Sequence, residues 1–177
     1  MKILVTGATG LVGTALVRAL AGDGHTVCGL RRPGGEKRAA AEGFDVAWNP
    51  ATGELGGAAV GADAVVNLAG ASIADRRWSM ERKALLRSSR VDTTRALVNA
   101  LGKMNVKPAV LVSASAIGYY GNRGEELLTE ESAAGTGAAA DDDAVLCFCR
   151  RAGGVRETMD VVCVARGCGG NFAAGAG

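Results

Sequence analysis

Three glycines at a regular spacing constrain this chain more than any other feature. Residues 2–6 form a short apolar run rich in β-branched side chains, which predicts a strand, and residues 11–21 carry apolar side chains at helical spacing. Gly7, Gly10 and Gly13 stand between these segments. A strand that turns directly into a helix leaves the first N–H groups of the helix without intrahelical partners, so they can bind a phosphate. The pattern therefore predicts a phosphate site at this bend.

Each glycine has its own expected role there. Gly7 permits the tight turn, Gly10 lacks the Cβ atom that would keep a pyrophosphate away, and Gly13 lets the helix pack closely on the strand. Because the motif follows a strand and opens a helix, it favours a dinucleotide site. An ordinary strand-to-helix turn without a ligand is the alternative.

The rest of the chain continues this alternation of strands and helices. We expect further strands at 26–30, 44–48, 64–68 and 109–113, helices at 36–43 and from Ser79 to Leu101, and a loop with one helical turn at 52–62. In the long helix Ser79 is the expected N-cap, and the stripe that packs on the sheet is Ala84, Val91, Thr94, Val98 and Leu101. The expected solvated face carries Arg82, Lys83, Arg87 and Arg95. The pattern predicts an α/β fold with a doubly wound parallel sheet.

The end of the second expected strand bears on the choice of cofactor. An acidic residue there would bind the ribose 2′-hydroxyl of NAD, whereas an arginine accommodates the 2′-phosphate of NADP. This chain has Arg31 and Arg32 at that position. We therefore predict NADP rather than NAD, the alternative being a pair of solvated loop arginines.

Composition excludes several other classes of protein. A net charge of +2 over 177 residues gives no reason to expect nucleic acid or an anionic membrane as a partner. Five cysteines without a C-x-x-C pair predict reduced thiols, with Cys28 a core residue on a strand. A single histidine excludes a histidine-based metal cluster, and 141–143 is interpreted as a solvated acidic run, so we expect no metal site. No apolar stretch has the length of a membrane span, and the first strand leaves no room for a signal peptide. We expect a soluble cytoplasmic protein, or an organellar one if a targeting segment is missing.

Four segments together resemble one known family. They are residues 5–13, 65–73, 76–78 with 89–97, and 112–121. The chain is similar in them to the epimerase family proteins of the atypical, extended short-chain dehydrogenase/reductase group, sometimes labelled nucleoside-diphosphate-sugar epimerases, from Met1 to about Ala133. The resemblance implies an NADP(H)-binding Rossmann domain, here 1–135, followed by a small C-terminal substrate domain.

Beyond residue 135 the sequence departs from the family pattern. We interpret 136–166 as a divergent end of the same domain, with a sixth strand at 160–165, and 167–177, rich in Gly and Ala, as a disordered tail. The substrate domain is lacking in this reading. An altered reading frame or a truncated gene product would explain both features.

The resemblance also implies the cofactor contacts. Residues of the bend would face the pyrophosphate, Arg31 and Arg32 the adenosine phosphate, and the segment after the fourth strand the adenine and ribose. Close packing explains Ala69 and Gly70 nearly as well, and Arg90, which would reach the cofactor, is equally well a surface ion-pair residue. The full expected set is Gly7, Thr9, Gly10, Leu11, Val12, Gly13, Arg31, Arg32, Leu68, Ala69, Gly70, Arg90 and Ser113.

For catalysis, Ser115 and Tyr119 reproduce the family's spacing of a serine four residues before a tyrosine. The alternative, which the sequence supports equally, is that both are polar residues lining the site without a catalytic role. The family's separate Tyr-x-x-x-Lys pair, whose lysine lowers the pKa of the phenol, is absent from this chain. The sequence therefore supports an NADP(H)-dependent oxidoreductase or epimerase-like protein acting on a small hydroxyl or keto compound, such as a nucleotide sugar. The alternatives are a non-catalytic NADP(H)-binding regulatory module and a truncated, inactive chain, and an oligomer is compatible with each.

Overall fold

The structure is a computed structural model that describes residues 1–34, 44–73, 75–116, 120–129, 132–133, 135 and 160–166. For residues 44, 115, 116 and 160–166 the description covers the backbone alone. The expected helix at 36–43 and the expected disordered tail lie outside these ranges.

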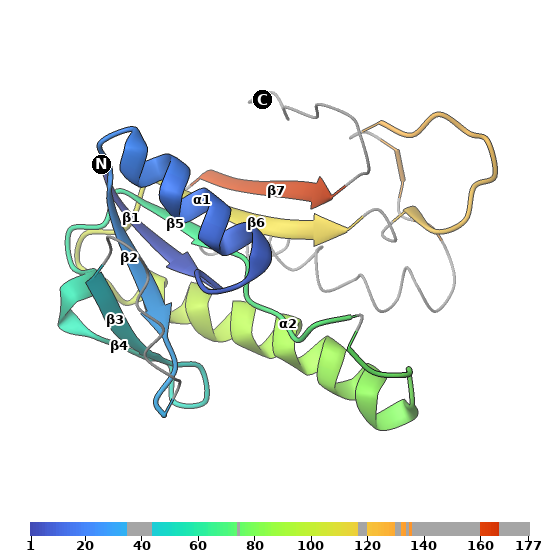
Figure 1. Ribbon diagram of the computed structural model, residues 1–177, viewed down its shortest axis with the longest axis horizontal. Helices are drawn as coiled ribbons and strands as arrows, with labels where there is room; N and C mark the ends of the chain where they lie inside the picture. Colours follow the sequence, from blue (N-terminus) through green and yellow to red (C-terminus); the bar gives the residue numbers. More distant parts are fainter. Residues whose placement is uncertain are drawn as a thin grey trace.

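A seven-stranded sheet in the order β4-β3-β2-β1-β5-β6-β7 forms the centre of the fold (Figure 1). Every neighbouring pair is parallel except β3 and β4, which are antiparallel. The chain builds one half of the sheet outward from β1, then crosses back to place β5 on the other side of β1. The order thus reverses between β1 and β5, the position at which open α/β sheets place their ligands. The strands are β1 (Lys2–Thr6), β2 (Thr26–Arg31), β3 (Phe44–Asn49), β4 (Glu54–Leu55), β5 (Ala64–Asn67), β6 (Val110–Ala116) and β7 (Asp160–Arg166).

Two helices, α1 (Leu11–Gly22) and α2 (Met80–Gly102), lie on opposite sides of this sheet (Figure 1). A single 3-10 turn, η1 (Gly57–Ala59), precedes β5. Strands covered on both faces are buried on both, as β1, β2 and β5 are, whereas β3 alternates buried residues with the exposed Asp45 and Ala47. The domain therefore has two cores, one under each helix.

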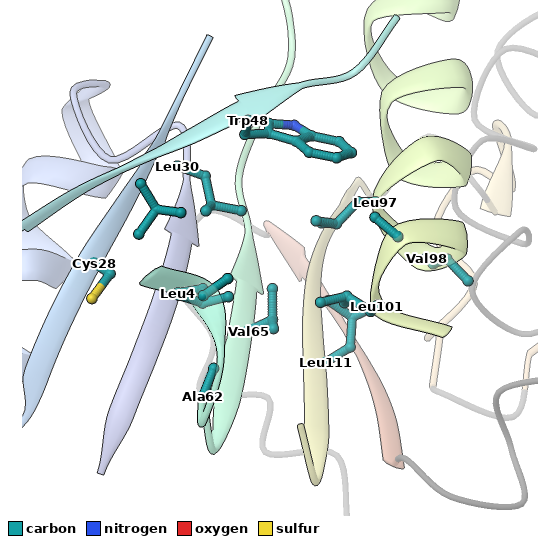
Figure 2. Packing of buried hydrophobic residues seen from close by; sticks show 13 residues of the cluster. Leu4, Cys28, Leu30, Trp48, Ala62, Val65, Leu97, Val98, Leu101 and Leu111 are labelled. Atoms are coloured by element: carbon teal, nitrogen blue, oxygen red, sulfur yellow. The ribbon is translucent and has the colours of Figure 1, made fainter. Parts of the chain in front are cut away.

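The larger core lies between the sheet and α2. Leu97 and Leu101 of α2 are fully buried against Leu4, Val65 and Leu111 from the three central strands (Figure 2). Full burial of each such side chain stabilises the fold by about 1.5–3 kcal/mol. This cluster fixes α2 against the strands whose carboxyl ends form the site below.

The smaller core lies under α1. Val17 of α1 packs against Ile3 and Val5 of β1 and Val27 of β2, with Ala8 of the glycine bend at its edge. On β1 and β2 the residues of the two cores alternate, as the period of two in a strand requires. The α1 core therefore anchors the bend directly to the first two strands.

Most of the predicted elements are confirmed. The first strand, the first helix and the second, third and fourth strands lie where the pattern placed them, within one residue at most boundaries. The fifth strand begins one residue later and runs three residues further than predicted, and a strand at 160–166 pairs in parallel with β6. Cys28 is a buried core residue of β2, as expected.

The predicted α/β fold with a doubly wound parallel sheet is confirmed, and two details differ from the prediction. The segment 52–62 contains the predicted helical turn but also the short strand β4, so one antiparallel pair lies at the edge of an otherwise parallel sheet. In α2 the predicted stripe holds for Thr94, Val98 and Leu101, which are buried, but Ala84 is exposed and Val91 is half-buried. The reason is that the N-terminal half of α2 packs against the loop after β5 rather than on the sheet, as the contacts below show.

Candidate functional site

The turn from β1 into α1 requires a glycine at its first position for two independent reasons. Gly7 has φ of +68°, in the left-handed region that favours glycine. A Cβ atom at Gly7 would also lie 2.9 Å from the carbonyl carbon and oxygen of Leu68. The bend and the loop after β5 therefore approach each other more closely than any side chain allows.

The other two glycines shape the start of α1. A Cβ atom at Gly13 would lie 2.1 Å from the Gly7 carbonyl oxygen and 2.8 Å from the Cα atom of Ala8, so Gly13 lets the helix pack closely on the bend that follows β1. Gly10 is the N-cap of α1 and donates its N–H to the Gly7 carbonyl at 3.0 Å. A Cβ atom at Gly10 would meet only this carbonyl, at 3.3 Å. Gly10 therefore leaves the outer side of the bend open.

The N-terminus of α1 is suited to an anion. The cap makes no side-chain hydrogen bond to the helix, and the first turn of α1 carries no acidic residue that would compensate the positive end of the helix dipole. Thr9 and Gly10 are exposed, Leu11 is 91% exposed, and Val12 is half-buried. The side chains of the bend thus leave the helix end uncovered.

A buried polar network lies beside this bend, at the carboxyl ends of β1, β5 and β6. The Thr6 hydroxyl donates to Oδ1 of Asn67 at 2.6 Å, and Nδ2 of Asn67 donates to the hydroxyls of Thr94 at 2.9 Å and Ser113 at 3.2 Å. All four side chains are buried. The network ties three strands and α2 together at the point where the sheet order reverses, and Ser113 lies within it.

Thr6 also shapes the loop that follows β5. Its hydroxyl oxygen accepts hydrogen bonds from the N–H groups of Leu68 at 3.0 Å and Ala69 at 3.1 Å. Leu68 and Ala69, both predicted cofactor contacts, are half-buried next to the glycine bend. Sequence reasoning did not select Thr6 or Asn67 as site residues. The pairing of a threonine and an asparagine at the last positions of two buried apolar runs was the available signal.

Two consecutive residues of α2 hold the next part of that loop. The Ser89 hydroxyl accepts the N–H of Ala71 at 3.0 Å, and Nη2 of Arg90 donates to the Ala71 carbonyl at 3.1 Å. Nη1 of Arg90 donates to the Leu86 carbonyl within α2 at 3.2 Å. A Cβ atom at Gly70 would lie 2.9 Å from the Arg90 guanidinium carbon. The structure thus places Arg90, predicted as a cofactor contact, against the backbone of the loop.

The following part of the segment between β5 and α2 is held by Arg82 of α2 and by a contact within the segment. Arg82 donates to the Ser72 carbonyl and forms an ion pair with Asp75, and Nε1 of Trp78 donates to the Ile73 carbonyl at 3.0 Å. The Arg82 side chain is only 11% exposed, so the prediction of a solvated Arg82 is wrong. Lys83, Arg87 and Arg95 are exposed as predicted.

The two arginines at the end of β2 occupy different surroundings. Arg31 is the last residue of β2, and its Nε atom lies 3.1 Å from Oδ2 of Asp45 on β3. Arg32 is exposed in the loop that follows. Both guanidinium groups belong to the same end of the sheet as the glycine bend, because parallel strands share their carboxyl edge.

The predicted catalytic pair is only partly described. Ser115 lies on β6, where its backbone pairs with Ala165 of β7. Tyr119 lies outside the described residues, whereas its neighbour Tyr120 is half-buried. The expected contact of the Ser115 and Tyr119 side chains with a substrate stays a prediction.

Other surface features lie apart from this site. A shallow hollow of about 240 Å³ is formed by the β4 and η1 region and the C-terminal end of α2, with Lys103 and Met104 in its wall. Within the described ranges no group of three or more His, Cys, Asp or Glu side chains is arranged to hold a metal ion. In the same ranges no helix combines the length and the apolar composition needed to cross a membrane.

The sheet is largely parallel and flanked by helices, and its first strand turns through a glycine bend where the strand order reverses. These features define a Rossmann-like nucleotide-binding domain. The model of the NAD dependent epimerase/dehydratase family matches residues 3–140, and the chain belongs to this family.

The chain is also similar to individual epimerase family proteins. The chain is 42% identical over 139 residues to epimerase family protein Mb2239 of Mycobacterium bovis, an alignment that covers 78% of this chain and 44% of that protein. It is 34% identical over 123 residues to human epimerase family protein SDR39U1, covering 68% of this chain and 38% of the human protein. The chain therefore spans less than half the length of these relatives.

Solved structures agree with this assignment. The crystal structure of human epimerase family protein SDR39U1 (isoform 2) with NADPH superposes with a TM-score of 0.74 at 27% identity, covering 96% of this chain and 56% of that one. UDP-glucose 4-epimerase from Brucella ovis in complex with NAD gives a TM-score of 0.73 at 18% identity, covering 93% and 51%, a likeness that concerns the fold alone.

Proposed function

We propose that this chain binds NADP(H), with the diphosphate at the glycine bend and the adenosine 2′-phosphate at Arg31 and Arg32. The observation that supports this most is the cradle at the bend. Backbone carbonyls fill the space that Cβ atoms of Gly7 and Gly13 would need, while Gly10 and the helix end remain accessible. Such a bend allows a ligand to come close to the backbone N–H groups.

The charges at the site fit the phosphorylated cofactor. NADPH carries a 2′-phosphate that NADH lacks, and two arginines stand at the end of β2 where an NAD-binding domain carries an acid. The human relative whose structure contains NADPH supports the same choice. Leu68, Ala69 and Gly70 would border the cofactor from the loop after β5, held in place by Thr6, Ser89 and Arg90.

When bound, NADP(H) supplies hydride transfer. We propose that the substrate is a small hydroxyl or keto compound, such as a nucleotide sugar, bound beside β6 with its carbinol held by the hydroxyls of Ser115 and Tyr119. The name of the family, NAD dependent epimerase/dehydratase, supports this class of substrate. Within this proposal the chain's own residues bind and orient the reactants, and the buried network at Asn67 fixes the end of β6 that carries Ser115.

A second candidate is NADP(H) binding without turnover. The only tyrosines are Tyr119 and Tyr120, and the residues four positions after them are Arg123 and Gly124. No lysine follows Lys107. The sequence therefore lacks the family's Tyr-x-x-x-Lys pair, in which the lysine prepares the phenol for general acid and base catalysis. This observation favours a cofactor-binding regulatory module over an enzyme.

Isothermal titration with NADPH and with NADH tests the common part of both candidates. We expect NADPH to bind at least tenfold more tightly than NADH, because only NADPH carries the group that pairs with the arginines. Gly10→Ala would weaken NADPH binding, since its methyl group enters the open side of the bend, whereas Arg18→Ala on the exposed face of α1 would not. The absence of binding heat with either cofactor would contradict the proposal.

Turnover separates the two candidates. NADPH oxidation would be followed with a panel of small carbonyl compounds and nucleotide sugars, in wild type and in Ser115→Ala. Turnover that falls in Ser115→Ala at unchanged NADPH affinity supports the enzyme. Tight NADPH binding with no turnover across the panel supports the binding module.

A further inference from the structure

We propose that Asp45 is a positioning residue that orients Arg31 toward the adenosine 2′-phosphate and thereby sets the preference for NADP(H) over NAD(H). This inference rests on the proposed function, because it concerns the same cofactor site. Asp45 belongs to β3 and is not among the site residues expected from the sequence.

The register of the sheet places Asp45 behind Arg31. Asp45 pairs with Gly29 of β2, and Arg31, two residues further on, pairs with Ala47 of β3. Residues two apart on a strand share a face, and partners in register do too, so Gly29, Arg31 and Asp45 lie on one face of the sheet. Asp45 therefore approaches Arg31 from the interior of the sheet, while Arg31 stands at the carboxyl edge.

The absence of a side chain at Gly29 leaves room for this arrangement. A Cβ atom at Gly29 would lie 3.4 Å from Oδ1 of Asp45 and 3.4 Å from the Cβ atom of Ala8. The Asp45 carboxylate thus reaches over Gly29 on the side that faces the glycine bend, where Ala8 lies. The same space connects the proposed diphosphate position with the end of β2. Asp45, Gly29 and Ala8 together form the floor of this part of the site.

The ion pair between the two residues suits positioning better than stabilisation. The Nε of Arg31 lies 3.1 Å from Oδ2 of Asp45, and the two side chains are 35% and 37% exposed. A pair that is this accessible to water contributes only about 0–1 kcal/mol to the fold. The contact at Nε is an ion pair without a hydrogen bond, so Asp45 acts on the guanidinium through charge attraction at 3.1 Å, which restrains where the Arg31 group lies.

Charge repulsion alone would make Asp45 weaken NADPH binding rather than strengthen it. Asp45 and a 2′-phosphate are both anionic, so removing the carboxylate would strengthen NADPH binding if repulsion dominated. Because Asp45 lies on the interior side of Arg31, we expect the loss of orientation to dominate instead. The two effects predict opposite signs for one substitution, which makes the inference directly testable.

Asp45→Asn keeps the size of the side chain and removes its charge. We expect NADPH affinity, measured by isothermal titration, to fall about threefold to tenfold, the loss that follows when one long side chain must be ordered on binding. NADH affinity would stay within about twofold, because NADH lacks the phosphate. The matched control is Asp92→Asn, which removes a similar exposed ion pair, 3.2 Å from Arg95, on α2, and would change neither affinity.

A double-mutant cycle completes the test. In an Arg31→Ala background, Asp45→Asn would have no further effect on NADPH affinity, because the group that Asp45 orients is gone. Unchanged or tighter NADPH binding by Asp45→Asn overturns the inference while leaving the proposed function intact. Wild type that binds neither cofactor contradicts the proposed function itself and this inference with it. If Asp45→Asn does not fold, Asp45→Glu, which keeps the charge and displaces it by one methylene, replaces it with the same expected loss of NADPH selectivity.

Discussion

The hydroxyl of Thr6 donates a 2.6 Å hydrogen bond to Oδ1 of Asn67 across the two strands between which the order of the sheet reverses. The same hydroxyl oxygen accepts the N–H groups of Leu68 and Ala69, so one side chain links β1 to the loop after β5. Buried polar groups are costly unless every partner is present. The Thr6–Asn67 pair therefore determines the shape of the loop that borders the glycine bend.

Replacing Asn67 by leucine tests the cost of this network. Asn67→Leu removes the partner of three buried hydroxyl groups, and we expect a loss of about 2–3 kcal/mol in the free energy of unfolding, measured with urea. Asn99→Leu, the same exchange at an exposed position of α2, would change stability by no more than about 0.5 kcal/mol. Equal effects of the two substitutions would show that the network contributes nothing specific.

Alanine substitutions at two glycines of α1 are expected to act in opposite directions. At Gly13 the new Cβ atom would lie 2.1 Å from a backbone oxygen, so we expect Gly13→Ala to cost about 3 kcal/mol or more. At Gly22, the last residue of the helix, a Cβ atom has no neighbour within 4 Å, and Gly22→Ala is expected to stabilise by about 0.4–1 kcal/mol. Thermal unfolding of both variants checks the two signs. A Gly13→Ala variant as stable as wild type would contradict the close packing described for the bend.

Gly70 and Arg90 are expected to be energetically coupled. Gly70→Ala would push the Arg90 guanidinium away from the Ala71 carbonyl, at a cost of about 1–2 kcal/mol. In an Arg90→Ala background the obstacle is absent, so the cost of Gly70→Ala would be smaller by about 1 kcal/mol. The four variants of this cycle would be compared by urea denaturation. Strictly additive effects would contradict the contact between the two residues.

The cap of α2 predicts a dependence on pH. The Ser79 hydroxyl accepts the N–H of Arg82 at 3.2 Å, so Ser79→Ala would cost about 1 kcal/mol at neutral pH. Two hydrogen bonds hold the pKa of Glu81 below its usual range. The larger effect comes from the Ser79 side chain and the smaller from the backbone of Glu81 itself.

A carboxyl whose pKa is lowered by folding stabilises the native state above its unfolded pKa, and this contribution disappears as the pH falls through the folded pKa. The difference in stability between wild type and Ser79→Ala is therefore expected to narrow between about pH 7 and about pH 3. Urea denaturation of both proteins at the two pH values measures it. A difference that grows toward acid pH would contradict the role assigned to Glu81.

The sequence predicted the frame of this domain better than its interior contacts. The glycine spacing and the apolar runs located β1, α1 and β5, because these signals are local and periodic. The short strand β4 was missed because two residues give no period, and it exists through pairing with Trp48 and Asn49 of β3. The exposed Ala84 was misplaced because helical spacing alone does not show which part of a long helix extends beyond the sheet.

In the candidate site, too, local sequence patterns could be interpreted, whereas contacts between distant residues could not be predicted. The bend and the arginines at the end of β2 were selected as candidate residues because their residue types carry the chemistry directly. The polar network at Asn67, the contacts of Arg90 with the loop and the pairing of Asp45 with Arg31 depend on which strands are neighbours. Residues 61, 19 and 14 positions apart meet in these three contacts, and no local pattern relates residues at such distances.

The central claim is that the bend after β1 holds the diphosphate of NADP(H), and amide NMR shifts during titration with NADPH test it most directly. We predict that the largest shift changes fall on the N–H groups of residues 9–13, at the open end of α1, while those at the far end of the helix, around Gly22, stay unchanged. Binding of NADPH that leaves the amides of residues 9–13 unperturbed would contradict the account.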